Sequence, residues 1–158
     1  MFGKKIAYIK EQYFGLILGF IVSVFVFLIN PELSKWKEFI KEFPTIGMFV
    51  FGFLLTLLTI ILQGNSSTIE WMKSRENLFK RFISFNKRVV IISIILSVYA
   101  YFLAYFNFDW IKGYFTDYMS LYVFAKKILI SVFVLLFVWL LYDVMYFIKI
   151  FYLLIKKN

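Results

Sequence analysis

The sequence predicts an all-α integral membrane protein, a four-helix bundle forming one transmembrane domain over residues 1–158. Three observations support this prediction. The chain is 63% hydrophobic, far above the share usual in soluble domains, and its mean hydropathy is +0.84. Four apolar runs approach the length that crosses a bilayer. The 22 Phe and 11 Tyr are more large side chains than a soluble protein of this size could bury.

The residue types that are absent exclude several kinds of chemistry. The chain has no Cys and no His, which removes disulfide exchange, Cys nucleophiles and the commonest metal ligands. It also lacks a phosphate-binding Gly loop and a plausible pair of nucleophile and base. We therefore expect no enzyme activity, no metal and no cofactor. The net charge of +9 is typical of Lys and Arg anchoring helix ends, so it does not favour direct nucleic-acid binding.

The first span is expected at residues 13–29, a run without charges. Lys4 and Lys5 before it imitate a signal peptide, but no small-residue cleavage site follows, so we interpret the run as an uncleaved span. Small residues recur in it at intervals of four, a face on which another helix can pack closely. They are Gly15, Gly19 and Ser23.

A short interfacial helix is expected at residues 31–43. Asn30 followed by Pro31 is typical of a helix start, and Pro44 should end the helix because proline disfavours helical geometry in the residue before it. The segment is too short and too polar to span the membrane, which suits a connector lying on the bilayer.

The second span, expected at residues 46–62, carries a stripe of small and polar side chains. Spacings of 4, 3 and 4 residues put them on one helix face. They are Gly52, Thr56, Thr59 and Gln63. Two interpretations stay open: the stripe packs against another helix, as small and hydroxyl residues often do in membranes, or it lines a narrow pore.

A basic amphipathic helix is expected at residues 68–88, leading into the third span. Ser67 and Glu70 have the spacing of a capping box after Gly64. The helix either continues straight into the span or bends near Asn86 and lies on the bilayer. Its basic residues are candidates for binding anionic lipid or an acidic soluble partner. They are Lys73, Arg75, Lys80, Arg81, Lys87 and Arg88.

The last two spans are expected at residues 89–106 and 128–148, the latter after Lys126 and Lys127. The third span has a second small-residue face, which suggests close packing with the second span, within or between subunits. Its members are Ser93, Ser97, Ala100 and Ala104. The intervening segment from Asn107 to Tyr122 is rich in Trp and Tyr, as in a headgroup region. Asp143 is expected to be a counter-ion or interface charge rather than a midplane proton relay.

The distribution of positive charge predicts the orientation. Twelve of the eighteen Lys and Arg residues lie in the two terminal segments and in the loop between the second and third spans. Cytoplasmic segments carry the excess of positive charge. Both termini and the basic loop are therefore predicted to be cytoplasmic.

The middle of the chain resembles a known group of proteins. Leu57-Leu58-Thr59-Ile60 leads into Gly64-Asn65-Ser66-Ser67 and then into the basic run. With its small size and four spans, this pattern is similar to the small four-helix membrane effectors of bacterial anti-phage systems, the RexB-like abortive-infection proteins. The resemblance implies an oligomer in the bacterial inner membrane that permeabilises or depolarises it on infection, and it carries over no catalytic residues.

Three functions follow from these features. The first is a homo-oligomeric, multi-pass effector of the bacterial inner membrane that forms or gates a pore and is triggered through the basic loop. The second is a non-conducting scaffold or anchor that recruits a soluble cytoplasmic partner. The third is a holin-like lysis protein. Membrane lipids are expected partners in all three.

Overall fold

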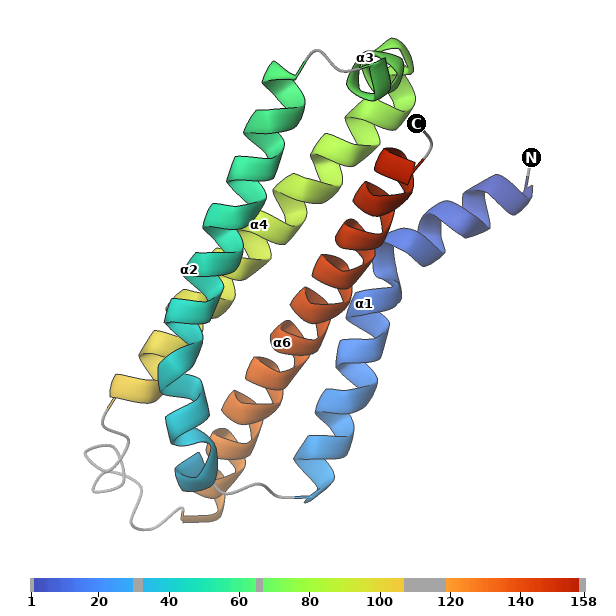
Figure 1. Cartoon of the computed structure of the whole chain (residues 1–158). Coiled ribbons are helices and arrows are strands. Elements are labelled where there is room, and N and C mark those ends of the chain that lie inside the picture. The colour runs from blue at the N-terminus through green and yellow to red at the C-terminus, as the bar shows by residue number, and fades with distance from the viewer. Residues whose placement is uncertain (1, 30–32, 65–66, 107–118, 157–158) are drawn as a thin grey trace.

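The computed structural model describes residues 2–29, 33–64, 67–106 and 119–156, and its elements there are all helices. They are α1 (Phe2–Ile29), α2 (Leu33–Gln63), α3 (Ser67–Ser74), α4 (Glu76–Tyr105) and α6 (Met119–Lys156). The all-helical prediction is confirmed. In Figure 1, α1, α2, α4 and α6 run alongside one another and the short α3 lies across one end.

The four long helices form an open row rather than a closed ring. α1 packs on α6, α6 packs on α4, and α4 packs on α2 (Figure 1). Polar side chains of α4 reach both of its neighbours: Asn86 Nδ2 donates to the carbonyl of Leu54 in α2 at 3.4 Å, and the Tyr99 hydroxyl donates to the carbonyl of Leu129 in α6 at 2.9 Å. α4 therefore links α2 to α6 along most of their length, and the start of α2 also packs directly on α6 through Phe39 and Phe43.

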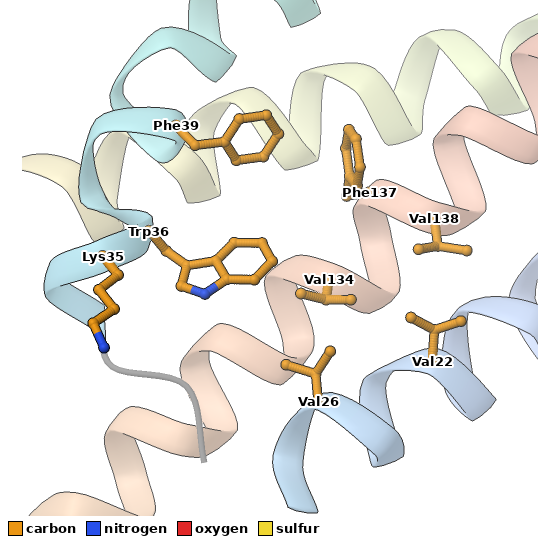
Figure 2. A pocket seen from close by; sticks show the side chains of 8 residues that line it. All are labelled: Val22, Val26, Lys35, Trp36, Phe39, Val134, Phe137 and Val138. Carbon is orange, nitrogen blue, oxygen red and sulfur yellow. The ribbon is translucent and has the colours of Figure 1, made fainter. Parts of the chain in front are cut away.

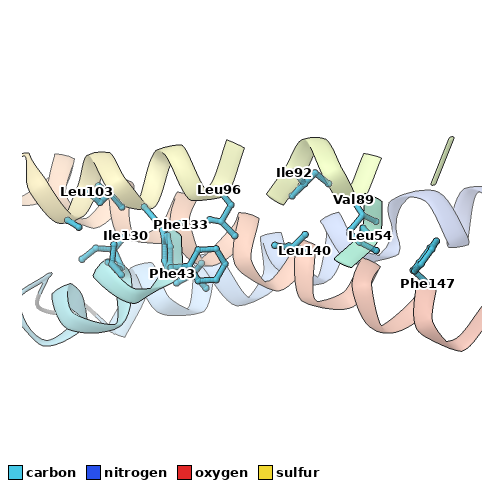
Figure 3. Packing of buried hydrophobic residues seen from close by; sticks show 14 of the residues in the cluster. Phe43, Leu54, Val89, Ile92, Leu96, Leu103, Ile130, Phe133, Leu140 and Phe147 are labelled. Carbon is cyan, nitrogen blue, oxygen red and sulfur yellow. The ribbon is translucent and has the colours of Figure 1, made fainter. Parts of the chain in front are cut away.

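The buried core comes from α2, α4 and α6. Figure 3 shows Phe43 beside Phe133, and Leu54 further along these helices beside Val89 and Leu140. Among the described side chains, α1 contributes only small residues to the buried set: Gly15, Gly19 and Ser23. α1 is thus attached to the outside of the core.

Within the described parts of the chain, three helices are long and apolar enough to cross a membrane: Lys35–Gln63, Phe79–Tyr105 and Met119–Tyr152. Each contains an 18-residue window of high mean hydropathy, 2.5, 1.9 and 2.5 in chain order, and many of the large apolar side chains of these helices are exposed. Such surfaces are stable in contact with lipid, which supports a multi-pass membrane protein. The first expected span, Tyr13–Ile29, is a shorter apolar helix within α1.

The prediction that Pro44 ends an interfacial helix is wrong. Pro44 lies inside α2, which continues from Leu33 to Gln63, so the expected helix at 31–43 is the start of the second span; residues 31 and 32 lie outside the described residues. Pro44 cannot donate a hydrogen bond to the carbonyl of Ile40, but Ile40 and Phe43 are buried. The Phe43 ring lies 5.6 Å from Phe133 and 5.5 Å from Phe137 in α6. This packing holds the helix together across the proline, as membrane helices often allow.

The basic segment also differs from the prediction. A new helix does begin at Ser67, but the segment breaks at Arg75, whose φ of −100° and ψ of 77° are not helical. α4 then continues through Asn86 without ending there, so the predicted alternative of a bend near Asn86 is wrong. α6 begins at Met119, so Lys126 and Lys127 lie within it, and most of the segment rich in Trp and Tyr lies outside the described residues.

The short α3 and the last turns of α6 lie at one end of the row, and the first turns of α1 bend outward near that end (Figure 1). The start of α2 and the start of α6 lie at the other end. The segments predicted to be cytoplasmic therefore share one end of the molecule.

Candidate functional site

The α2 stripe of Gly52, Thr56, Thr59 and Gln63 faces away from the other helices. All four residues are exposed in the single chain, and a Cβ added at Gly52 would have no atom within 4 Å. The Thr56 and Thr59 hydroxyls each donate to a carbonyl of their own helix, those of Gly52 and Leu55, at 2.9 Å. The stripe therefore does not pack against another of the described helices.

The small face of α4 meets α2 at a different place. Ser93, Ser97, Ala100 and Ala104 are all buried. A Cβ added at Gly47 of α2 would overlap the Ser97 hydroxyl. The expected close packing of the second and third spans thus occurs within the subunit, but at Gly47, one turn and more before the α2 stripe. The sequence analysis did not single out Gly47, although a glycine within an apolar span is itself an indication of close helix packing.

Gly15 and Gly19 lie where α1 approaches α6 most closely. A Cβ at Gly19 would lie 2.6 Å from the carbonyl oxygen of Leu135, and one at Gly15 would lie 2.9 Å from the rings of Trp139 and Tyr142. Ser23, one turn further, donates to the carbonyl of Phe20 at 2.8 Å. Glycine is required at the first two positions because backbone, or a packed ring, fills the space of a side chain.

A buried ion pair joins α4 to α6. Arg88 Nε donates to Asp143 Oδ2 at 3.0 Å; the Asp143 side chain is 1% exposed and that of Arg88 20%. The Arg88 guanidinium also lies 4.6 Å from the centre of the Phe85 ring. Asp143 Oδ1 lies 3.1 Å from where a Cβ on Gly15 would be, so α1 covers this pair. The expected counter-ion role of Asp143 thus has a specific partner, Arg88, which sequence reasoning assigned to lipid or partner binding.

The other basic residues are divided between internal contacts and the surface. Lys73 Nζ donates to the carbonyls of Leu62 and Gly64, at 3.0 and 3.1 Å, and so caps the end of α2. Arg75 lies 4.8 Å from the centre of the Trp71 ring. Lys80 pairs with Glu76 one turn before it, and Lys80, Arg81 and Lys87 are exposed. The surface available to a partner at this end is therefore smaller than the sequence suggested.

Replacing Lys73 with Met should lower the free energy of unfolding by about 1 kcal/mol, because two carbonyls at the end of α2 lose a charged donor. The matched control is Lys80→Met, which removes an exposed pair worth about 0.3–0.5 kcal/mol. Denaturation of the purified chain in mixed micelles measures both. Equal effects of the two substitutions would contradict a capping role for Lys73.

Comparison of the chain with protein-family models, with curated proteins and with solved structures finds no match.

Proposed function

We propose that the chain is a four-span membrane protein that assembles as a homo-oligomer in a bacterial inner membrane, with the α2 stripe lining a pore between subunits. The observation that carries this proposal is the outward exposure of the stripe in the protomer. An exposed amide at Gln63 is costly against hydrocarbon unless a partner or water satisfies it. Glycine and threonine allow a second helix to approach closely.

The hydrogen bonds of the two threonines support a path for cations. Because the Thr56 and Thr59 hydroxyls donate to their own helix, the remaining lone pairs of their oxygens are available on the outer face. A ring of subunits would then present hydroxyl oxygens to a permeating ion. Rings of oxygen acceptors replace the hydration shell of a cation rather than that of an anion.

The trigger in this proposal acts at the end of the bundle that carries α3, with both termini on the cytoplasmic side. Lys80, Arg81 and Lys87 are exposed there and can receive an acidic partner or an anionic membrane surface. A role as an effector of anti-phage defence is consistent with such a triggered pore.

Replacing Thr56 and Thr59 together with Val should abolish depolarisation of the membrane in bacteria that express the chain. Valine keeps the shape of threonine but removes the oxygen. The control is the double replacement with Ser, which retains both hydroxyls and should retain depolarisation. Membrane potential is measured after induction, with protein in the membrane quantified in parallel. Depolarisation by the Val variant equal to that of the unmodified chain would rule out the stripe as the pore lining.

A second candidate function is a membrane anchor that recruits a soluble partner. The observation that favours it is the exposed basic surface at the α3 end, where Arg75 also lies over Trp71. An anchor needs that surface and not the α2 stripe. If the unmodified chain leaves the membrane potential unchanged in vesicles and cells alike, the anchor becomes the better explanation.

A further inference from the structure

An apolar groove lies between α1 and α2, with α6 as its floor. It has a volume of about 430 Å³, within the range of small-molecule sites. Val22 and Val26 of α1 form one wall, Trp36 and Phe39 of α2 the other, and Val134 and Phe137 lie on the floor (Figure 2). The groove exists because the helices form an open row, in which α1 packs on α6 and α2 packs on α4.

The walls of the groove are built from segments that suit the membrane interior. Val22 and Val26 belong to the apolar helix Tyr13–Ile29, and the remaining apolar walls belong to two of the helices long enough to span a bilayer. The Phe39 ring lies 5.6 Å from that of Phe137 and 6.2 Å from that of Phe133. This wall is therefore held by ring packing with α6. Water would find few hydrogen-bond partners against such walls.

A slender apolar group suits a groove between two helices. An alkyl chain is narrower than a helix with its side chains, which is about 10 Å across. It can therefore lie along the groove between α1 and α2 and contact α6.

One end of the groove is polar. Lys35 lies at this end in the first turn of α2, its side chain directed away from the apolar walls, and the Trp36 indole projects over Val26 and Val134 (Figure 2). Lysine is a compact cation suited to phosphate, and tryptophan is enriched at the level of lipid headgroups. We propose that the groove binds a phospholipid, with one acyl chain between α1 and α2 and its phosphate at Lys35.

The test uses Trp36 as the reporter. In the full-length chain, Trp71, Trp110 and Trp139 are replaced with Phe, which leaves Trp36 as the fluorophore. The chain is reconstituted in phosphatidylcholine vesicles with increasing fractions of phosphatidylglycerol carrying brominated acyl chains, which quench tryptophan on contact. We expect quenching to saturate at a low fraction of brominated lipid. Quenching proportional to that fraction throughout would show contact with bulk lipid alone and would overturn the proposal.

Matched variants separate the acyl and phosphate contacts. Val26→Phe fills the groove and should remove the saturable quenching, whereas Val24→Phe on the exposed face of α1 should not. Lys35→Gln should raise the half-saturating fraction of phosphatidylglycerol about fivefold, and Lys37→Gln, outside the groove, should leave it unchanged. Equal effects within either pair of variants would refute the site.

A second measurement guards against misfolding of the tryptophan variants. Native mass spectrometry of the chain with all four tryptophans should detect one retained phospholipid per subunit, which is lost in Val26→Phe but kept in Val24→Phe. If quenching instead falls as the ratio of protein to lipid is raised, a second copy of the chain occupies the groove and the lipid assignment is wrong.

Discussion

Replacing Arg88 with Ala is expected to lower the free energy of unfolding by about 3 kcal/mol or more, because it leaves the Asp143 carboxylate buried without its partner. Asp143 has 0% of its surface exposed, and Arg88 Nε is its charged donor at 3.0 Å. Replacing Asp143 with Leu should lower the free energy of unfolding by less than Arg88→Ala does. The Arg88 side chain is 20% exposed, so its guanidinium can move toward water along its flexible stem.

The control for this prediction is the double variant Arg88→Met with Asp143→Leu. Exchanging both charges for apolar side chains of similar size is often neutral, so the double variant should recover most of the stability that Arg88→Ala loses. Unfolding of the full-length chain in lipid bicelles gives the free energies of Arg88→Ala, of Arg88→Met and Asp143→Leu singly, and of the double variant. If the double variant is as unstable as the sum of Arg88→Met and Asp143→Leu measured singly, the two side chains act independently and the ion pair does not hold α4 to α6.

Replacing Gly19 with Leu is expected to separate α1 from α6. A Cβ at this position would lie 2.6 Å from the Leu135 carbonyl oxygen, which belongs to the backbone and cannot rotate away. Overpacking of this kind costs about 1–3 kcal/mol, and more where the obstacle is backbone. α1 contributes no large buried side chain among those described, so this close approach is an important part of its attachment, beside the packing of Val22 and Val26 on the core. Disulfide crosslinking between cysteines introduced at Val22 and Val138 should therefore decrease strongly.

The matched control is Gly52→Leu, which makes the same substitution at a glycine with no neighbour within 4 Å. It should leave folding of the subunit and the α1–α6 crosslink unchanged. Under the proposed oligomer it should reduce association between subunits, as measured by the oligomer distribution in lipid. An α1–α6 crosslink that survives Gly19→Leu, or one that is lost equally in Gly52→Leu, would contradict the predicted contact.

Much of the helical architecture could be predicted from the sequence because bilayer thickness and hydrophobicity act on each segment separately. The long apolar runs correspond to the helices that can cross a membrane, and the expected end of the third span at residue 106 lies next to the observed end at Tyr105. The start of a new helix after Gly64 could also be predicted, because a helix start depends on a local pattern of capping residues.

The errors have a common cause, which is that local rules were overridden by contacts between helices. Pro44 breaks a hydrogen bond of α2, but rings of α6 pack against Phe43 and keep the helix continuous. The spacing of small and polar residues singled out Gly52 as a possible contact point, yet the glycine of α2 that lies against Ser97 of α4 is Gly47. Packing between helices determines how each helix is rotated about its own axis. The periodicity of residues within one segment does not determine this rotation.

The sequence by itself determined the class of this protein, because apolar composition and run length depend only on transfer of each segment into lipid. It also determined which residues share each helix face. Only the tertiary structure decided which faces meet: it left the α2 stripe exposed, and it brought Arg88 and Asp143, 55 residues apart in the chain, into one buried pair. An apolar helix face is about equally stable against lipid and against another helix. The neighbours of a membrane helix therefore depend on the fit between helix surfaces and on pairing of buried charges.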